Sequence, residues 1–208
     1  MNTQSGRSMV EMLGVLAIIG VLSVGAISGY SKAMFKYKLN KHAEQMNTVI
    51  NAVARNIHSF DNIKQNGTSL TPYFIKMGEI PIEMIKSNDN NFMYDTFGQQ
   101  WAIIIESASY IYLMSYHEDG SSFLSSNSSD SLAICQNVLT IAKKYSDNID
   151  SVLTETHGSI FYIFGDNADD ELDDAYGWLS TLTLDDIHTI CSEHTKGGEA
   201  VFIIAWKR

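Results

Sequence analysis

Residues 9–30 of this chain read MVEMLGVLAIIGVLSVGAISGY, and they decide how the rest of it is organised. Glu11 is the only charged residue between the start of this segment and Lys32. A helix needs about 20 apolar residues to cross the hydrocarbon core of a bilayer, so the segment is long enough to span one. A cleaved secretory signal ends in a small-residue cleavage site, whereas the small residues here are scattered along the segment. The segment therefore predicts a membrane-spanning helix.

The helical pattern continues beyond the apolar segment, because no proline occurs before Pro72 and apolar residues keep recurring at spacings of three and four. This spacing keeps one face of the helix apolar. The apolar positions are Met46, Val49, Ile50, Val53, Ala54 and Ile57. We expect one helix over residues 8–58, about 75 Å long at 1.5 Å per residue, with its first half in lipid and its second half packed on a domain.

The remaining residues predict one globular domain, since a chain of 208 residues with 45% hydrophobic composition buries one core and is short for two. Segments rich in β-branched and aromatic residues predict strands over 101–105, 110–116, 159–164 and 200–206. Two further helices are expected over 130–144, capped by Asp130, and over 183–191, opened by Thr183. The fold class is α+β: a long N-terminal helix packed on an antiparallel sheet of four or more strands, with additional helices.

Two stretches predict irregular connections. Residues 60–91 contain Asn66-Gly67, Pro72 and Pro81, and we expect them to form a loop with a short helix over 82–86. Residues 121–131 are rich in serine and predict an exposed loop.

Composition and motifs exclude several classes of function. The chain has 14 Lys and Arg against 24 Asp and Glu, a formal charge of -10 that would repel phosphate backbones, so we predict no nucleic-acid partner. No phosphate-binding glycine loop, serine-hydrolase elbow or metalloprotease helix occurs in it. We therefore expect neither catalysis nor a cofactor.

Two clusters of possible metal ligands were considered. His188, Cys191 and His194 are spaced by three and could approach one metal ion on a helix, but no fourth ligand is evident, and we predict no metal there. The acidic run over 166–174 lacks the glycine of an EF-hand loop. A solvated acidic loop and a calcium site both remain open for this run.

Cys135 and Cys191 are the only cysteines of the chain. They are compatible with one disulfide, if the domain lies outside the cytoplasm, or with two buried free thiols.

Glu11 is unusual because a carboxylate inside a membrane helix costs several kcal/mol and normally has a partner or a function. The other interpretation is that Glu11 reaches the membrane interface near the start of the helix. Ser5-Gly6, followed by Arg7-Ser8-Met9-Val10-Glu11 and an unbroken apolar run, resembles the leader junction of type IV prepilins. That family has a short polar leader, a glycine before the cleavage site and a glutamate as the fifth residue after it.

The resemblance implies a role for each residue of the junction. Gly6 would be the last leader residue recognised by the prepilin peptidase, and Arg7 would become an N-methylated N-terminus. Glu11 would pair with the N-terminal amine of a neighbouring subunit and set the axial register of a filament. The domains implied are a leader over 1–6, a transmembrane and filament-core half-helix over 7–30, an amphipathic half-helix over 31–58 and a globular domain over 59–208.

The implied function is that of a structural subunit that polymerises into a type IV pilus. The subunit would be a single-pass protein of the bacterial inner membrane with a periplasmic C-terminal domain, and inner-membrane assembly machinery would transfer it to a pilus on the cell surface. Phe97-Gly98-Gln99-Gln100 and the pair Cys135 and Cys191 resemble an aromatic-glycine turn and a disulfide of type IVb pilins. The resemblance thus favours the disulfide.

Two alternatives to a pilus subunit remain at this point: a type II secretion pseudopilin, and a membrane-anchored adhesin or receptor domain that does not polymerise. One observation opposes the implied orientation. Lys32, Lys36, Lys38 and Lys41 follow the apolar segment on the side that the resemblance places outside the cytoplasm. The positive-inside rule alone predicts the opposite orientation.

Overall fold

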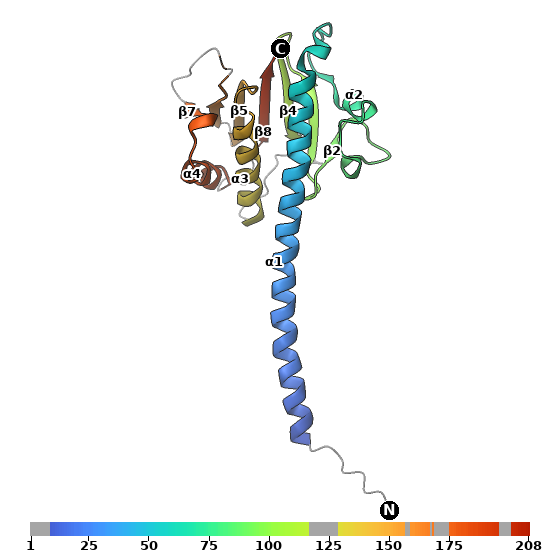
Figure 1. Cartoon of the computed structure of the whole chain (residues 1–208), viewed down its shortest axis with the longest axis vertical. Helices are drawn as coiled ribbons and strands as arrows, with labels where there is room; N and C mark the ends of the chain where they lie inside the picture. Colours follow the sequence, from blue (N-terminus) through green and yellow to red (C-terminus); the bar gives the residue numbers. More distant parts are fainter. Residues whose placement is uncertain (1–8, 117–128, 157–158, 167, 169–174, 196–200) are drawn as a thin grey trace, which may run out of the picture. The chain divides into compact units, whose positions relative to one another are not determined.

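The structure, a computed structural model, describes residues 9–116, 129–156, 159–166, 168, 175–195 and 201–208. The chain divides into two compact units, Met1–Lys38 and Leu39–Arg208, which we call the stem and the head. Helix α1 (Met9–Asn56) runs through both and is followed by a 3-10 turn, η1 (Ile57–Phe60) (Figure 1). The prediction of one long helix is confirmed.

The described residues of the head form one eight-stranded sheet. Its strands are β1 (Thr68–Ser69), β2 (Met93–Tyr94), β3 (Gln100–Ile105), β4 (Tyr110–Tyr116), β5 (Ser151–Thr156), β6 (Ser159–Phe164), β7 (Ala175–Trp178) and β8 (Val201–Lys207). They are ordered β1-β3-β4-β8-β5-β6-β7, and β2 pairs with β3. Only the β6–β7 pair is parallel, so the expected antiparallel sheet is confirmed in its main part.

The C-terminal strand β8 lies in the middle of the sheet rather than at an edge. Ile204 is paired with Leu113 of β4 on one side and with Val152 of β5 on the other. The guanidinium of Arg208, just beyond the strand, donates to the carbonyl oxygens of Phe60 and Ile63, each at 2.7 Å. The last residues of the chain therefore join the two halves of the sheet and hold the segment that follows α1.

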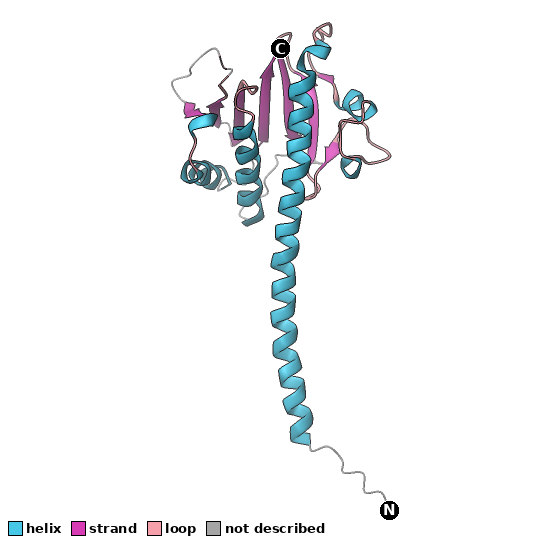
Figure 2. Cartoon of the chain, viewed as in Figure 1, coloured by secondary structure: helices cyan, strands magenta, loops and turns pink. Residues whose placement is uncertain are grey.

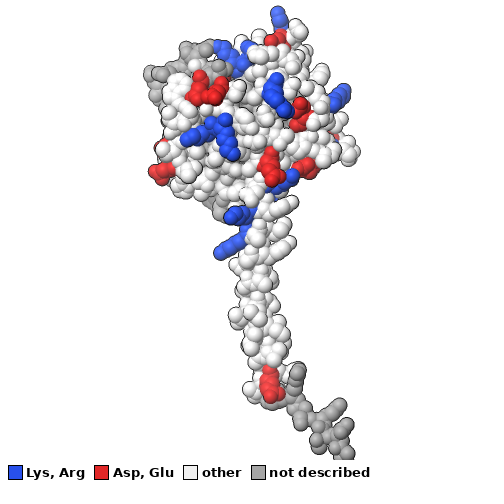
Figure 3. All heavy atoms as spheres, viewed as in Figure 1, with Lys and Arg blue, Asp and Glu red and all other residues white. Residues whose placement is uncertain are grey.

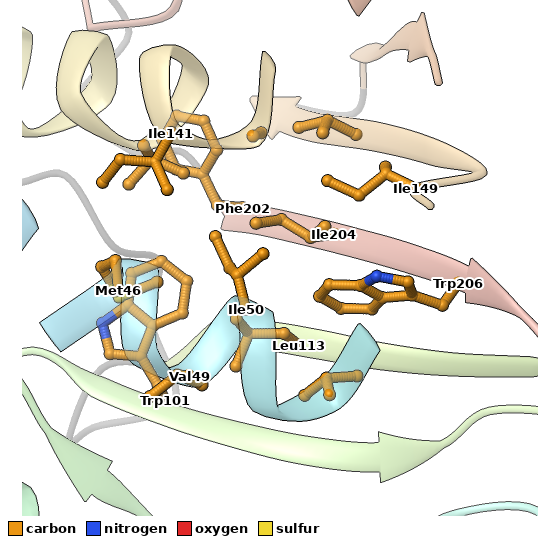
Figure 4. Close-up of a cluster of buried hydrophobic side chains, with 14 of the residues drawn as sticks. Met46, Val49, Ile50, Trp101, Leu113, Ile141, Ile149, Phe202, Ile204 and Trp206 are labelled. Atoms are coloured by element: carbon orange, nitrogen blue, oxygen red, sulfur yellow. The ribbon is translucent and has the colours of Figure 1, made fainter. Parts of the chain in front are cut away.

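Helices α1 and α3 (Ser129–Lys144) cover one face of the sheet, and Figure 2 shows both in front of the strands. The core forms between them (Figure 4). Ile50 from α1 and Ile141 from α3 meet the alternating residues Phe202, Ile204 and Trp206 of β8, all of which are buried. Because side chains alternate between the two faces of a strand, the spacing of two places these three residues on the helix-covered face.

A disulfide joins α3 to α4 (Leu184–Thr195). Cys135 and Cys191 are 56 residues apart in sequence, their Cα atoms are 5.7 Å apart, and both are fully buried. The pairing favoured by the resemblance is confirmed, and the alternative of two free thiols is wrong. Lys143 of α3 donates to the carbonyl oxygen of Leu182, just before α4, so the two helices are tied at a second point.

Several local predictions were wrong. Residues 71–76 form a helix, α2 (Thr71–Lys76), within the stretch expected to be a loop. Pro72 lies in the first turn of α2, where a missing N–H costs no helical hydrogen bond, so it begins a helix rather than breaking one. The short helix expected over 82–86 is only a 3-10 turn, η2 (Ile82–Met84), and another 3-10 turn, η3 (Leu179–Thr181), was not expected.

The boundaries of the later helices also differ from expectation. Helix α3 begins at Ser129, so Asp130 lies in its first turn instead of capping it, and the end of the predicted serine-rich loop is helical. The rest of that loop, through residue 128, lies outside the described residues. Helix α4 extends to Thr195, beyond the predicted end at 191. Its predicted start is confirmed, because the Thr183 hydroxyl accepts from the Asp186 N–H at 3.1 Å and donates to the Asp186 carboxylate at 2.7 Å.

We predict that replacing both cysteines by serine lowers the free energy of unfolding by about 4 kcal/mol, because the unfolded chain regains the entropy of a 56-residue loop. Urea titration of the full-length protein in detergent, followed by tryptophan fluorescence, measures the change. Wild-type protein treated with a reductant should unfold at the same urea concentration as the variant. Equal stability of the oxidised wild type and the variant would show that packing alone holds α4 on α3.

Candidate functional site

The first candidate site is the apolar segment, residues 9–30 of α1. Its large hydrophobic side chains are exposed in the single chain, from 53% for Ile19 to 82% for Met9. Among the described residues, α1 is the one helix long and apolar enough to cross a membrane. Figure 3 shows this part of the stem as uncharged apart from one acidic residue near its beginning. A continuous apolar surface of this kind requires lipid or another apolar surface around it.

Two hydroxyl groups of the stem are satisfied in a way that suits an environment without water. Ser23 Oγ donates to the carbonyl oxygen of Ile19 at 2.7 Å, and Ser31 Oγ donates to that of Ile27 at 3.0 Å. Each bond goes to the carbonyl four residues earlier in the same helix. These hydroxyl groups therefore enter a bilayer without losing hydrogen bonds.

No contact within the described chain explains why the apolar segment contains four glycines. Apart from its chain neighbours and the backbone of its own helix, a Cβ atom added to Gly14, Gly20, Gly25 or Gly29 would meet no atom within 4 Å. Each glycine in a helix interior costs about 1 kcal/mol relative to alanine. Gly25 and Gly29 form a G-x-x-x-G spacing, which lets membrane helices approach closely. Reasoning from the sequence missed this spacing, although it can be read directly.

Glu11 lies in the first turn of α1 as described. A negative charge is favourable there because it faces the positive end of the helix dipole. Gly6 and Arg7, the predicted cleavage and methylation residues, lie outside the described residues. Their roles, and the pairing of Glu11 with a neighbouring amine, stay predictions.

The second candidate site is the group of polar contacts that ties residues 39–56 of α1 to the rest of the head. We call it the polar anchor, and it consists of His42, Gln45, Asp95, Thr96 and Asn137. Gln45 Oε1 accepts hydrogen bonds from the Thr96 backbone N–H at 3.0 Å and from the Thr96 hydroxyl at 2.8 Å. Since Gln45 and Thr96 are 51 residues apart, these bonds fix α1 against the turn before β3.

The contacts of Asn137 indicate the tautomer of a neutral His42 ring. Asn137 Nδ2 donates to the Leu39 carbonyl oxygen at 3.1 Å and lies 2.9 Å from His42 Nδ1. With one hydrogen directed at each acceptor, Nδ1 must present its lone pair, so the proton of a neutral imidazole sits on Nε2. Nε2 lies 3.3 Å from Asp95 Oδ2, in electrostatic contact but without the geometry of a good hydrogen bond. His42 is fully buried.

Asp95 organises the turn on the other side of the polar anchor. Its Oδ1 accepts from the backbone N–H groups of Phe97 at 2.8 Å and Gln99 at 3.0 Å, and its Oδ2 accepts from Trp101 Nε1 at 3.0 Å. Gly98 has a φ of 84°, a conformation that favours glycine. The aromatic-glycine turn expected from the sequence is therefore present. Sequence reasoning missed Asp95 itself, although an Asp three residues before a Gly is a turn signal.

The possible metal ligands have other partners. The sulfur of Cys191 is bonded to Cys135, and His188 Nδ1 lies 2.9 Å from Gln136 Nε2. The side chain of His194 lies outside the described residues. Within the described part of the chain, no three His, Cys, Asp or Glu side chains gather as a metal site would require.

Of the acidic run over 166–174, only Asp166 and Ala168 are described. Asp166 accepts hydrogen bonds from the hydroxyl groups of Ser180 at 2.7 Å and Ser146 at 2.9 Å. Both bonds lower the pKa of Asp166, the bond from Ser180 most. The choice between a solvated loop and a calcium site stays open.

Comparison with known proteins assigns no family, because no family model, curated protein or solved structure matches this chain. Its function must be argued from its own residues.

We predict that Gln45→Ala destabilises the head by about 1–3 kcal/mol, because it leaves two donors of Thr96 without their acceptor in a partly buried site. Urea unfolding of the full-length protein measures the change. Gln136→Ala is the matched control, since it removes the same side chain from an exposed contact with His188. The control should cost less than half as much, and equal losses would contradict an anchoring role for Gln45.

Proposed function

We propose that this chain is a structural subunit of a type IV pilus, cut by a prepilin peptidase after Gly6 and polymerised through its apolar segment. One observation carries the proposal. The Gly6-Arg7 junction is followed by an exposed apolar helix of transmembrane length, whose single charge is Glu11. The same helix continues into the α+β head.

The apolar segment explains both stages of such a function. Before assembly its side chains lie in the lipid of the inner membrane. In the filament they pack against the apolar segments of other copies, so they move from one apolar environment to another and never meet water. Gly25 and Gly29 support close packing of this kind, because the single chain gives them no other role.

In the proposed filament, Glu11 fixes the axial position of each subunit relative to the next. Cleavage after Gly6 creates a new amine at Arg7, four residues before Glu11. The amine of one subunit pairs with Glu11 of the next, which neutralises two charges that would each be costly in an apolar core. Without such a fixed point, helices covered only by apolar side chains could slide along one another.

The disulfide supports a head outside the cytoplasm. Disulfides persist in oxidising compartments such as the bacterial periplasm and are rare in the cytosol. The bond between Cys135 and Cys191 thus agrees with an anchor that leaves the head in the periplasm.

The first test is the mature N-terminus. Full-length protein expressed with a prepilin peptidase should begin at Arg7 by intact-mass and peptide mass spectrometry, and without the peptidase it should begin at Met1. Gly6→Leu should abolish the cut, whereas the neighbouring Ser5→Ala should leave it. If the chain stays uncut while a control prepilin is cut, the prepilin proposal is refuted. The alternative of a permanently anchored adhesin or receptor domain would then hold.

The second test is assembly. Glu11→Ala should be cut normally but should lower the yield of sheared filaments by at least about tenfold, because an unpaired buried amine costs several kcal/mol. Glu44→Ala removes an exposed carboxylate from the same helix and should assemble like wild type. Normal assembly of Glu11→Ala would exclude the register role, and a chain that is cut but forms filaments only with a secretion system would be a pseudopilin.

A further inference from the structure

A group of basic and aromatic residues follows the apolar segment at the end of the stem. We call it the basic collar, and it consists of Tyr30, Lys32, Lys36, Tyr37 and Lys38. All five side chains are exposed, the two tyrosines by 67% and 62%. The proposed function gives the collar no role.

The position of the collar matches the edge of a bilayer. The 21 residues from Met9 to Gly29 span about 31 Å as a helix, close to the hydrocarbon thickness of about 30 Å. Tyr30 then lies where the hydrocarbon ends. Residues 32–38 cover about 9 Å more, roughly the depth of one headgroup layer. Tyrosine and lysine are the side chains that hold helices at this depth.

Taken together, the five collar residues are spread around the helix, with the three lysines within an arc of about 160° and the two tyrosines on the opposite side. At 100° per residue, and taking Lys32 as zero, Lys36 lies at about 40° and Lys38 at about 240°, with the tyrosines at about 140° and 160°. A protein partner would contact one side of the helix, whereas lipid surrounds it. Lysines on one side and tyrosines on the other are both side chains of the membrane interface, so the distribution of the five residues favours lipid.

The lysines of the collar differ from the lysine that follows them. Lys41 Nζ lies 2.8 Å from Glu83 Oε1 and 3.4 Å from Glu44 Oε2, and Glu83 raises the pKa of Lys41 most. In the described part of the chain, no carboxylate lies within ion-pair distance of Lys32, Lys36 or Lys38. Their charges remain available to anions outside the chain.

The charge of the head makes such a collar useful. Of the 14 basic and 24 acidic residues, Arg7, the three collar lysines and Glu11 belong to residues 1–38, which leaves 10 basic and 23 acidic residues in 39–208. A strongly acidic head is repelled by an anionic membrane surface. The proposed function, which the disulfide supports, puts the collar outside the cytoplasm, where the positive-inside rule gives no reason for three lysines.

We propose that the basic collar binds the phosphate groups of anionic phospholipids in the non-cytoplasmic leaflet and holds the unassembled subunit at a fixed depth. This inference rests on the membrane anchoring in the proposed function.

The test reconstitutes the full-length chain into phosphatidylcholine vesicles that contain a minority of phosphatidylglycerol. Discs cut out with a styrene–maleic acid copolymer are purified on the protein, and their lipids are quantified by mass spectrometry. Phosphatidylglycerol should be enriched roughly two- to fivefold over the bulk vesicle, and less at high salt. The variant Lys32→Gln/Lys36→Gln/Lys38→Gln should lose the enrichment.

Lys64→Gln/Lys76→Gln/Lys144→Gln is the matched control, because it removes the same charge from three exposed lysines of the head and should keep the enrichment. Equal lipid composition for wild type and the collar variant overturns the inference while the proposed function stands. The inference is also overturned if the collar variant keeps its lipids but loses cross-linking between copies, since the collar then binds the acidic surface of a second copy. A wild-type chain that alkaline carbonate washes off the vesicles would instead refute the membrane anchor itself.

Discussion

The exclusion of the apolar segment from water is the constraint on which the rest of the structure depends. At about 25 cal/mol for each Å² of apolar surface, an exposed side chain the size of Leu or Ile costs about 1.5–3 kcal/mol in water, and residues 9–30 present many of them on one helix. A bilayer satisfies this constraint, and so does a bundle of identical helices. A carboxylate in such surroundings tolerates few partners, and this is the physical basis of the register role proposed for Glu11.

The second half of α1 meets a different requirement, because it must hold a head in water without sliding. Met46, Val49 and Ile50 bury apolar surface, and such contacts have little directionality. Directional hydrogen bonds from the polar anchor complete the attachment, with Gln45 bonded to Thr96 and Asn137 bonded to Leu39. Two kinds of interaction therefore position this half of α1. Hydrophobic burial holds it against the sheet, and buried polar groups fix its position along its own axis.

The helices and strands that could be predicted from the sequence are those whose residues show a local hydrophobic or β-branched pattern. The period of three and four along α1 and the β-branched content of β3, β4, β6 and β8 were sufficient for those elements. Strand β5, SVLTET, was missed because its polar, threonine-rich pattern is stabilised by pairing with β6 and β8, which no local signal records. Asn137 was missed for the same reason, since its partner His42 lies 95 residues away in sequence. Asp95 is different, because the groups that donate to it lie within six residues and its turn signal is local.

The strand order of the head determines when its sheet can be completed. Strands β4 and β5 are joined only by β8, which residues 201–207 supply. The sheet therefore cannot be completed until nearly the whole chain is available. Under the proposed function, the head would complete its sheet only after residues 201–207 have crossed the membrane. Cys191 precedes β8 in the chain, so under the proposed export the disulfide partners would reach an oxidising compartment before the central strand does.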